Sequence, residues 1–175
     1  MPPQDHHLYQ LVKQWEEAAA LPADCPTHHA IVRVSLVLGP WGGMVDALWN
    51  QMYFHLGGTL GSGRQMASWI HLEDLGELFL FAAEKQVSGV LNGSTPTPVS
   101  METLIQAFAG AMGRRAFLWA PSFLVRTIFD GPRSAILLKG NRVIPQHALD
   151  LGFQFKYRDI HTAFGDIVKA RQSIQ

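Results

Sequence analysis

The sequence predicts an α/β fold with a parallel sheet, and two observations carry this prediction. Residues 30–38 form a nearly continuous apolar and β-branched run that stops at Gly39-Pro40, which is typical of a strand buried on both faces. A helical pattern over residues 8–20 precedes this run across a polar loop at 22–29. Helix, loop and buried strand in this order make half of a βαβ unit.

The remaining elements follow from helical periodicity and from short apolar runs between turn residues. In chain order we expect a helix at 44–55, a glycine-rich loop at 57–63, a strand at 68–71, a helix beginning at 73–74, a strand at 90–92, helices at 101–112, 121–129 and 134–139, a strand at 153–157 and a helix at 159–169.

Two of these helices have recognisable starts. Glu73 and Asp74 lie in a first turn, where acidic groups favour the helix dipole, and Ser100 is a good N-cap. The inward faces predicted for the two helices are Leu75, Leu78, Phe79 and Ala82 for the first, and Leu104, Ile105, Phe108 and Met112 for the second.

Composition excludes several classes of function. Fourteen basic and 14 acidic residues give zero formal net charge, which argues against nucleic acid as a partner, because phosphate binding needs a basic surplus. Only 16% of the 175 residues are charged, below the roughly 25% of an ordinary soluble domain. This shortage suggests that part of the surface is covered by something else.

Targeting signals are not evident. Residues 1–7 lack the basic and apolar regions of a signal peptide, and no apolar run approaches the ~20 residues of a membrane span. Cys25 is the only cysteine, so no internal disulfide can form. We therefore expect a soluble, cytoplasmic protein.

Tyr9, Lys13 and Glu17 are spaced four residues apart and share one helix face. A tyrosine followed by a lysine one turn later is the acid–base device of short-chain dehydrogenases, in which the ammonium lowers the pKa of the phenol. On spacing alone, a solvated or packing face of the helix is the alternative interpretation.

A longer series of motifs resembles the epimerase-family branch of the extended short-chain dehydrogenase/reductases, which end in a small domain of unknown function. One landmark is the Gly-x-Gly turn at 61–63 with the short strand and His71-Leu72-Glu73-Asp74 that follow. The matching pieces, in order, are residues 15–19, 37–43, 56–75, 113–116, 120–121, 137–145 and 152–155.

The resemblance implies the C-terminal part of a Rossmann-like fold plus a small α-rich domain. Residues 1–60 correspond to a remnant of the dinucleotide-binding domain, 61–120 to a substrate-side α/β segment and 121–175 to the small C-terminal domain. It also implies NADP as cofactor and a small carbonyl compound, of unknown identity, as substrate. Tyr9 is then the catalytic acid–base, Lys13 assists it and holds the cofactor ribose, and Val37 contacts the nicotinamide.

The sequence departs from the family pattern in two ways. The strand–Gly-x-x-Gly-x-x-Gly–helix unit that cradles a pyrophosphate is missing, so the chain is expected to be a truncated form. Leu36 and Ala67 stand where nucleotide-sugar epimerases carry the Asn and Arg that bind the substrate, so "epimerase" is here a family label. Arg64 is either a substitute anion contact or a solvated loop residue.

Other kinds of site find little support. The loop at 58–65 has Arg64 and Gln65 where a P-loop needs Lys and Ser or Thr. The eight histidines show no metal-binding spacing, and His71 is expected to orient the start of its helix. The alternative to an oxidoreductase is a non-catalytic truncated isoform that binds a partner, or a second copy of itself, through an exposed sheet edge.

Overall fold

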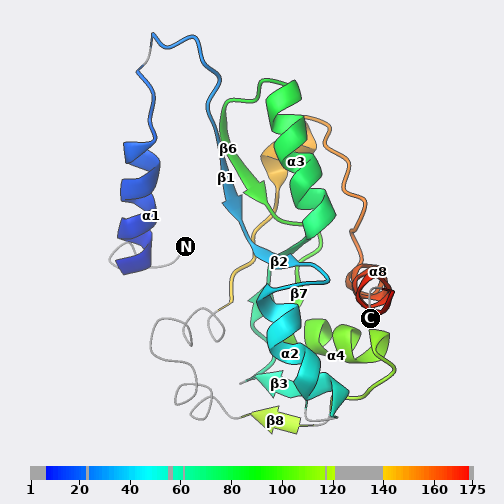
Figure 1. Cartoon of the computed structure of the whole chain (residues 1–175). Helices are drawn as coiled ribbons and strands as arrows, with labels where there is room; N and C mark the ends of the chain where they lie inside the picture. Colours follow the sequence, from blue (N-terminus) through cyan, green and yellow to red (C-terminus); the bar gives the residue numbers. More distant parts are fainter. Residues whose placement is uncertain are drawn as a thin grey trace.

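The computed structural model describes residues 7–22, 24–54, 57–60, 62–116, 118–120 and 140–173. Its helices are α1 (His7–Ala18), α2 (Gly43–Tyr53), α3 (Leu72–Glu84), α4 (Met101–Ala111), α7 (Gln146–Asp150) and α8 (Ile160–Gln172). Figure 1 shows α3 and α8 on one side of the strands and α1 on the other.

The predicted strand 30–38 is present but is divided at Ser35 into β1 (Ala30–Val34) and β2 (Leu36–Leu38). Both pair in parallel, β1 with β6 (Gly89–Gly93) and β2 with β5 (Trp69–His71), which confirms the parallel sheet. The partner changes where the Ser35 N–H donates to Gly93 O and the Leu36 N–H to Ser68 O.

Burial of this strand on both faces, however, is wrong for β1. Val34 is 48% exposed, and full burial is reached only at Leu38, the last residue of β2. Ala30 and Val32 are partly buried against the apolar cluster that lies under α3, but β6 is the only described strand that pairs with β1, so β1 lies at a sheet edge in the described fold.

Two further pairs involve very short strands. In the glycine-rich stretch predicted as a loop, β3 (Gly58–Leu60) pairs in parallel with β8 (Leu118–Ala120). The two residues of β4 (Met66–Ala67) pair antiparallel with β7 (Val99–Ser100). The sequence pattern did not predict β7, β8 or α7. The helices predicted at 121–129 and 134–139 lie outside the described residues.

The core consists of two apolar clusters on either side of β5. Trp69 packs into the first, between α2, α4 and α8, where Phe108 has its ring centroid 6.0 Å from Trp49 and 5.0 Å from Phe164. Ile70, the next residue, packs into the second, under α3. The alternation of side chains along a strand thus supplies both clusters from two consecutive residues.

The helix faces agree with the sequence with one exception. Leu104, Ile105 and Phe108 are buried on α4, and α3 buries Leu75, Leu78 and Ala82. Phe79, predicted to face inward, is half exposed. It stands one residue beyond Leu78, at the margin of the buried face.

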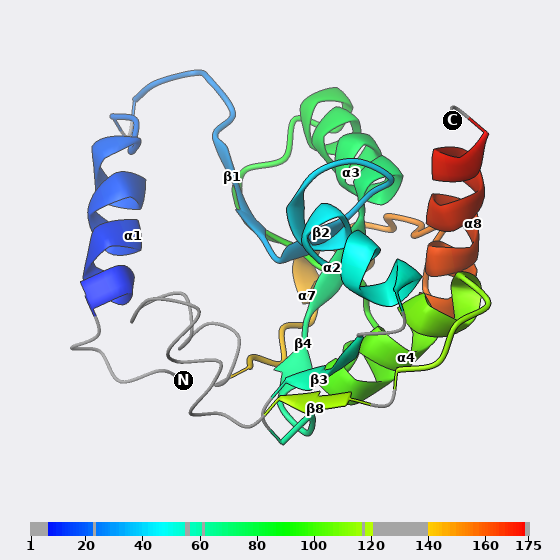
Figure 2. The same ribbon diagram turned by 60° about the horizontal axis from the view of Figure 1, so that its bottom comes forward.

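Helix α1 stands apart from the rest of the described fold in both ribbon views (Figures 1 and 2). Tyr9, Val12 and Trp15 of this helix are exposed, Trp15 at 64%, and no residue of α1 belongs to either cluster of the described core. The Arg33 guanidinium donates twice to the Glu16 carboxylate, at 2.7 Å, and so ties α1 to β1. Exposed apolar surface is therefore found, as the low charge content predicts.

Candidate functional site

The predicted catalytic pair lies on the solvent-exposed surface of α1. Tyr9 and Lys13 are one helical turn apart, and both are exposed. The Lys13 ammonium is 3.6 Å from the Glu17 carboxylate, the third residue of the same face. The helix face that carries Tyr9, Lys13 and Glu17 is therefore exposed to solvent. The catalytic role of Tyr9 and Lys13 stays a prediction.

Val37 lies on β2, opposite Ile70 on β5, and is half-buried against the cluster under α3. Because β2 and β5 are parallel, their carboxyl ends meet, with Leu38 paired to His71. In open α/β sheets ligands bind at this end of the strands. In both ribbon views, however, β2 is separated from α1, so the described residues do not bring Val37 next to Tyr9 and Lys13.

The loop that follows β2 leads directly into α2. Gly42 and Gly43 have φ angles of 74° and 56°, a left-handed conformation that favours glycine. The Asp46 carboxylate accepts the Gly42 N–H at 2.8 Å and so occupies the N-terminus of α2 with negative charge. The Gly42 N–H therefore already has an acceptor and is not available to a cofactor's pyrophosphate.

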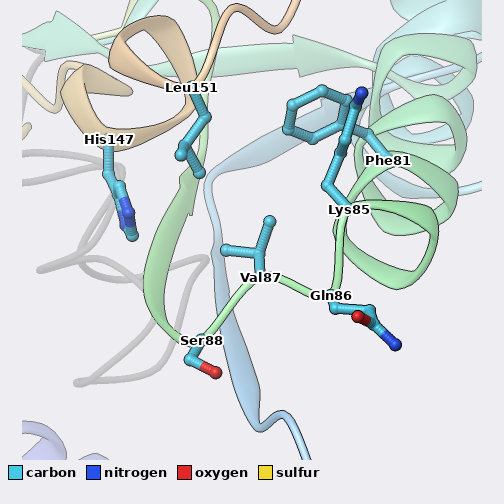
Figure 3. A pocket seen from close by; sticks show the side chains of 7 residues that line it. All are labelled: Phe81, Lys85, Gln86, Val87, Ser88, His147 and Leu151. Carbon is cyan, nitrogen blue, oxygen red and sulfur yellow. The ribbon is translucent and has the colours of Figure 1, made fainter.

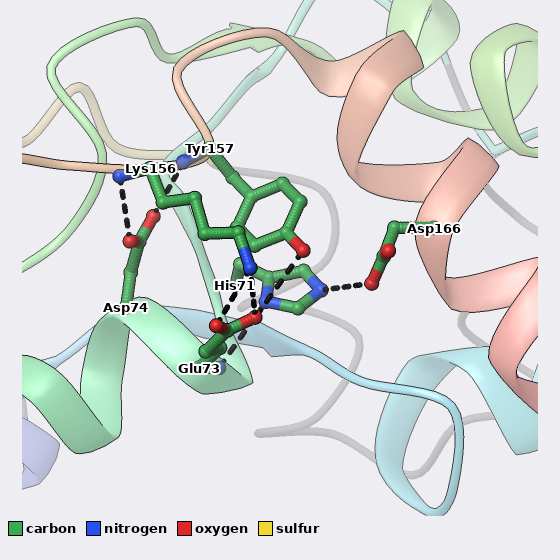
Figure 4. A network of polar contacts seen from close by, with 6 residues as sticks. All are labelled: His71, Glu73, Asp74, Lys156, Tyr157 and Asp166. Carbon is green, nitrogen blue, oxygen red and sulfur yellow. Dashed lines mark hydrogen bonds and ion pairs between the residues drawn. The ribbon is translucent and has the colours of Figure 1, made fainter.

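A polar network surrounds the start of α3 (Figure 4). His71, only 4% exposed, caps this helix, since its Nδ1 accepts the Glu73 N–H at 3.2 Å. Its Nε2 is 3.8 Å from the Asp166 carboxylate on α8. The prediction that His71 orients the helix start is confirmed.

Two carboxylates of α3 hold the chain segment 153–157 in place. Asp74, 1% exposed, accepts the backbone N–H groups of Lys156 and Tyr157 at 2.8 and 2.9 Å. Glu73 accepts from the Lys156 ammonium at 2.7 Å and from the Tyr157 hydroxyl at 3.2 Å. The predicted strand 153–157 is therefore wrong, because these amides bond to a carboxylate instead of a neighbouring strand.

Within this network Lys156 and Glu73 form an ion pair, whereas the buried Nε2 of His71 has no hydrogen-bond partner among the described residues. The hydrogen bond from Lys156 lowers the pKa of Glu73, and the same bond raises the pKa of Lys156. Burial raises the pKa of Tyr157 and lowers that of His71. Because most of these groups are engaged in joining α3, segment 153–157 and α8, the arrangement stabilises the fold and offers no obvious acid or base to a substrate.

Sequence reasoning found His71 but missed three of its partners. Lys156, Tyr157 and Asp166 have no motif of their own. The available signal was the alternation at 153–157, where Phe153, Phe155 and Tyr157 are buried and the residues between them exposed.

Two hollows on the described surface lie away from the carboxyl ends of β2 and β5. One, of about 360 Å³, is lined by Phe81, Lys85, Gln86, Val87, Ser88, His147 and Leu151 (Figure 3). It adjoins the amino end of β6, which begins at Gly89. The other, of about 480 Å³, lies between the segment 26–32 and α3. Neither therefore lies where a parallel sheet binds its ligand.

The remaining candidates add no second site. Arg64 is exposed in the loop before β4. Within the described ranges, no three His, Cys, Asp or Glu side chains gather closely enough to hold a metal ion. Among the described helices, none has the length and apolar character needed to cross a bilayer.

Comparison with known proteins identifies relatives along nearly the whole chain. The model of a domain of unknown function, DUF1731, matches residues 120–167. The human epimerase family protein SDR39U1 is 40% identical over 159 residues, which are 90% of this chain and 54% of the human protein. A chloroplastic homologue from Arabidopsis thaliana is 33% identical over 93% of this chain and 47% of its own length.

A solved structure agrees with these matches. The crystal structure of human SDR39U1 (isoform 2) with NADPH is similar at a TM-score of 0.90 and 37% identity, over 97% of this chain and 58% of the human chain. The chain thus spans about half the length of the curated relatives it matches. It has an α/β fold of the Rossmann-like type, and along most of its length it is similar to the proteins named epimerase family protein SDR39U1, which have the short-chain dehydrogenase/reductase fold.

Proposed function

We propose that this chain provides the nicotinamide and substrate side of an NADP-dependent oxidoreductase. One observation supports this most directly. The human relative was crystallised with NADPH, and its structure matches 97% of this chain at a TM-score of 0.90. The domain boundaries near residues 60 and 120, and the roles given below to single residues, are part of the proposal.

Three residues have roles in this proposal, although the described fold holds α1, with Tyr9 and Lys13, apart from β2, with Val37. Tyr9 donates or accepts a proton at its phenolic oxygen, on the carbonyl or alcohol oxygen of the substrate. Lys13, one turn away, stabilises the phenolate and binds the ribose hydroxyls through its ammonium. Val37 provides an apolar contact for the nicotinamide ring. The bound cofactor supplies or accepts the hydride.

The proposed substrate is a small carbonyl compound without a sugar nucleotide. Leu36 packs against the first apolar cluster and Ala67 is buried within it. Neither side chain has a hydrogen-bond donor, so neither position can bind a substrate phosphate or sugar hydroxyl. This favours an oxidoreductase over a nucleotide-sugar epimerase.

Titration of the purified chain with NADPH tests the proposal, with tryptophan fluorescence as readout. We expect saturable quenching with a dissociation constant in the micromolar range, weakened by Lys13→Met. Lys85→Met is the matched control, because it removes another exposed lysine at the opposite end of the sheet. Absence of saturable quenching in the wild-type chain contradicts cofactor binding by this form.

The role of Tyr9 needs an activity assay, for which a panel of small aldehydes and ketones is followed by NADPH absorbance. Loss of the phenolic proton in Tyr9→Phe is expected to lower turnover by about 100-fold or more, as general acid–base catalysis contributes 10²–10⁴. Unchanged turnover in a folded Tyr9→Phe variant would show that Tyr9 serves packing only.

A second candidate function is the binding of a second copy of this chain, and the exposure of α1 favours it. Trp15 is 64% exposed, and the edge of β1 away from β6 has no described partner strand. Unpaired strand edges and apolar helix faces associate readily. Light scattering after size exclusion is expected to give a dimer mass, shifted to monomer by Trp15→Glu but not by Gln14→Glu. A monomer mass for the wild type contradicts this function.

We also propose a cytoplasmic location. Its support is the sequence itself, which has one cysteine and therefore suits a reducing compartment. Imaging of the chain with a C-terminal fluorescent tag is expected to show diffuse cytoplasmic signal, and an organellar pattern would contradict this.

A further inference from the structure

The last turn of α8 reaches the loop that follows β2. Arg171 donates from Nη1 to the Pro40 carbonyl oxygen at 3.0 Å, and the same nitrogen forms an ion pair with the Asp46 carboxylate of α2. The other oxygen of Asp46 accepts the Gly42 N–H at 2.8 Å. The loop Gly39–Gly43 is thus held near both of its ends by one arginine–aspartate pair.

The guanidinium is also fixed by two aromatic rings. Its central carbon is 4.3 Å from the centroid of the Trp49 ring and 5.0 Å from that of Trp41. The side chain of Arg171 is only 12% exposed, so these cation–π contacts are shielded from water. Trp41 belongs to the loop and Trp49 to the core, so the arginine joins the loop to the interior.

Besides the contacts of Arg171, the loop is fixed by the packing of Gly39 beside Leu72 and by the Asp46 N–H, which donates to Gly42 O at 3.3 Å. Gly42 and Gly43 adopt left-handed φ angles, and an added Cβ at Gly42 would meet no atom within 4 Å. Trp41 is half exposed. Glycine residues gain the most entropy when a constraint is removed, so the loop depends on its polar contacts for a single conformation.

We infer that Arg171 is a positioning residue, which holds the loop Gly39–Gly43 at the carboxyl end of β2 and thereby sets the affinity of the chain for its nicotinamide cofactor. The inference rests on the proposed function, because Val37 and this loop form the expected nicotinamide end of the site. It adds a residue from the C-terminal helix, remote in sequence, to the determinants of that site.

Hydrogen exchange measured by mass spectrometry tests the structural half without any cofactor. In Arg171→Met we expect the peptide that contains residues 39–46 to exchange about tenfold faster or more, since a charge-assisted hydrogen bond is lost. Arg171→Lys keeps the charge but not the planar group, so it should restore protection only in part. Lys169→Met, which removes a neighbouring cation of the same turn, should leave the loop unchanged.

A second variant guards against a folding defect. Asp46→Asn weakens the ion pair but keeps Arg171 between its two tryptophans, and it should also speed exchange in 39–46 while peptides of α4 stay protected. Unchanged exchange of this loop in both Arg171→Met and Asp46→Asn overturns the inference. Loss of protection throughout the chain in both variants also overturns it, because Arg171 is then a general stabilising residue.

The functional half is tested by NADPH titration of the same variants. We expect the dissociation constant to rise about tenfold in Arg171→Met, the factor that corresponds to one lost hydrogen bond, and to stay unchanged in Lys169→Met. Faster loop exchange with unchanged NADPH affinity overturns the link to the cofactor and leaves the proposed function intact. If the wild-type chain binds no NADPH, the proposed function and the link fail together, whereas the exchange data still decide the role of Arg171 in the loop.

Discussion

The imidazole of His71 stacks on the phenol ring of Tyr157, with ring centroids 3.8 Å apart and planes inclined by 28°. This contact joins His71, the N-cap residue of α3, to segment 153–157. The Asp166 carboxylate of α8 faces the same imidazole. The charged groups around His71 are thus Glu73 and Asp74 from α3, Lys156 from the segment and Asp166 from α8. Tyr157 is the further titratable neighbour.

The buried His71 makes stability depend on pH. Burial lowers its pKa below the ordinary 6.5, although the carboxylates of Asp166, Asp74 and Glu73 oppose this shift. Well above pH 6.5 the imidazole is neutral in both the folded and the unfolded state, and its contribution to stability is complete. As pH falls below 6.5, the unfolded chain takes up the proton first, so the free energy of unfolding decreases.

Urea denaturation between pH 7.5 and 5 checks this expectation. His71→Asn keeps a side chain that can cap α3 but removes the titrating imidazole. The free energy of unfolding should therefore depend less on pH in this variant between pH 7.5 and 5. His161→Asn is the control, because His161 is an exposed histidine on α8. Equal slopes for wild type and His71→Asn contradict the assignment.

Asp74 should be among the costliest polar side chains to remove. Asp74→Ala leaves the partly buried N–H of Lys156 and the buried N–H of Tyr157 without their acceptor, and we expect a loss of about 3 kcal/mol in the free energy of unfolding. Glu73 is half exposed, so Glu73→Ala should cost at most about 1 kcal/mol. Urea titrations at pH 7 measure both, and similar costs for the two variants would contradict this role of Asp74.

Two leucines provide a matched test of the core. Leu104 on α4 is fully buried, whereas Leu80 on α3 is more than half exposed. Leu104→Ala should destabilise the chain by about 2–5 kcal/mol, because it leaves a cavity. Leu80→Ala should change stability by no more than about 0.5 kcal/mol. Thermal melts followed by circular dichroism compare them directly.

Two glycines should respond to alanine with opposite signs. Gly110 lies within α4 with no atom within 4 Å of an added Cβ, so Gly110→Ala should stabilise by up to about 1 kcal/mol through helix propensity. Gly140 has a φ of 57°, and an added Cβ would lie 2.6 Å from Met66 O. Gly140→Ala should therefore lower the melting temperature, and a rise would contradict the described backbone at this residue.

Local signals in the sequence were sufficient for most helices. Ser100 caps α4 as predicted, because its hydroxyl accepts the Thr103 N–H at 3.0 Å, an interaction that closes within three residues. His71 likewise accepts from Glu73, two residues ahead. Such contacts depend on spacing along the chain, which a sequence displays directly.

The strands were less predictable, since their partners are distant in sequence. The run 30–38 was recognisable as a strand, but its division at Ser35 arises because β6 and β5 pair with successive parts of it. Segment 153–157 alternates like a strand, yet its amides bond to Asp74, 83 residues from Tyr157. No local pattern distinguishes a carboxylate acceptor from a strand.

The sequence by itself determined the parallel α/β class, the family resemblance and the shared face of Tyr9 and Lys13, because these depend on composition, motif order and helical spacing. Only the tertiary structure decided that β1 is no more than partly buried, that no residue of α1 joins the described core clusters and that Arg171 binds Pro40 across 131 residues. These features follow from which surfaces pack together when the chain folds, and packing is a property of the whole molecule.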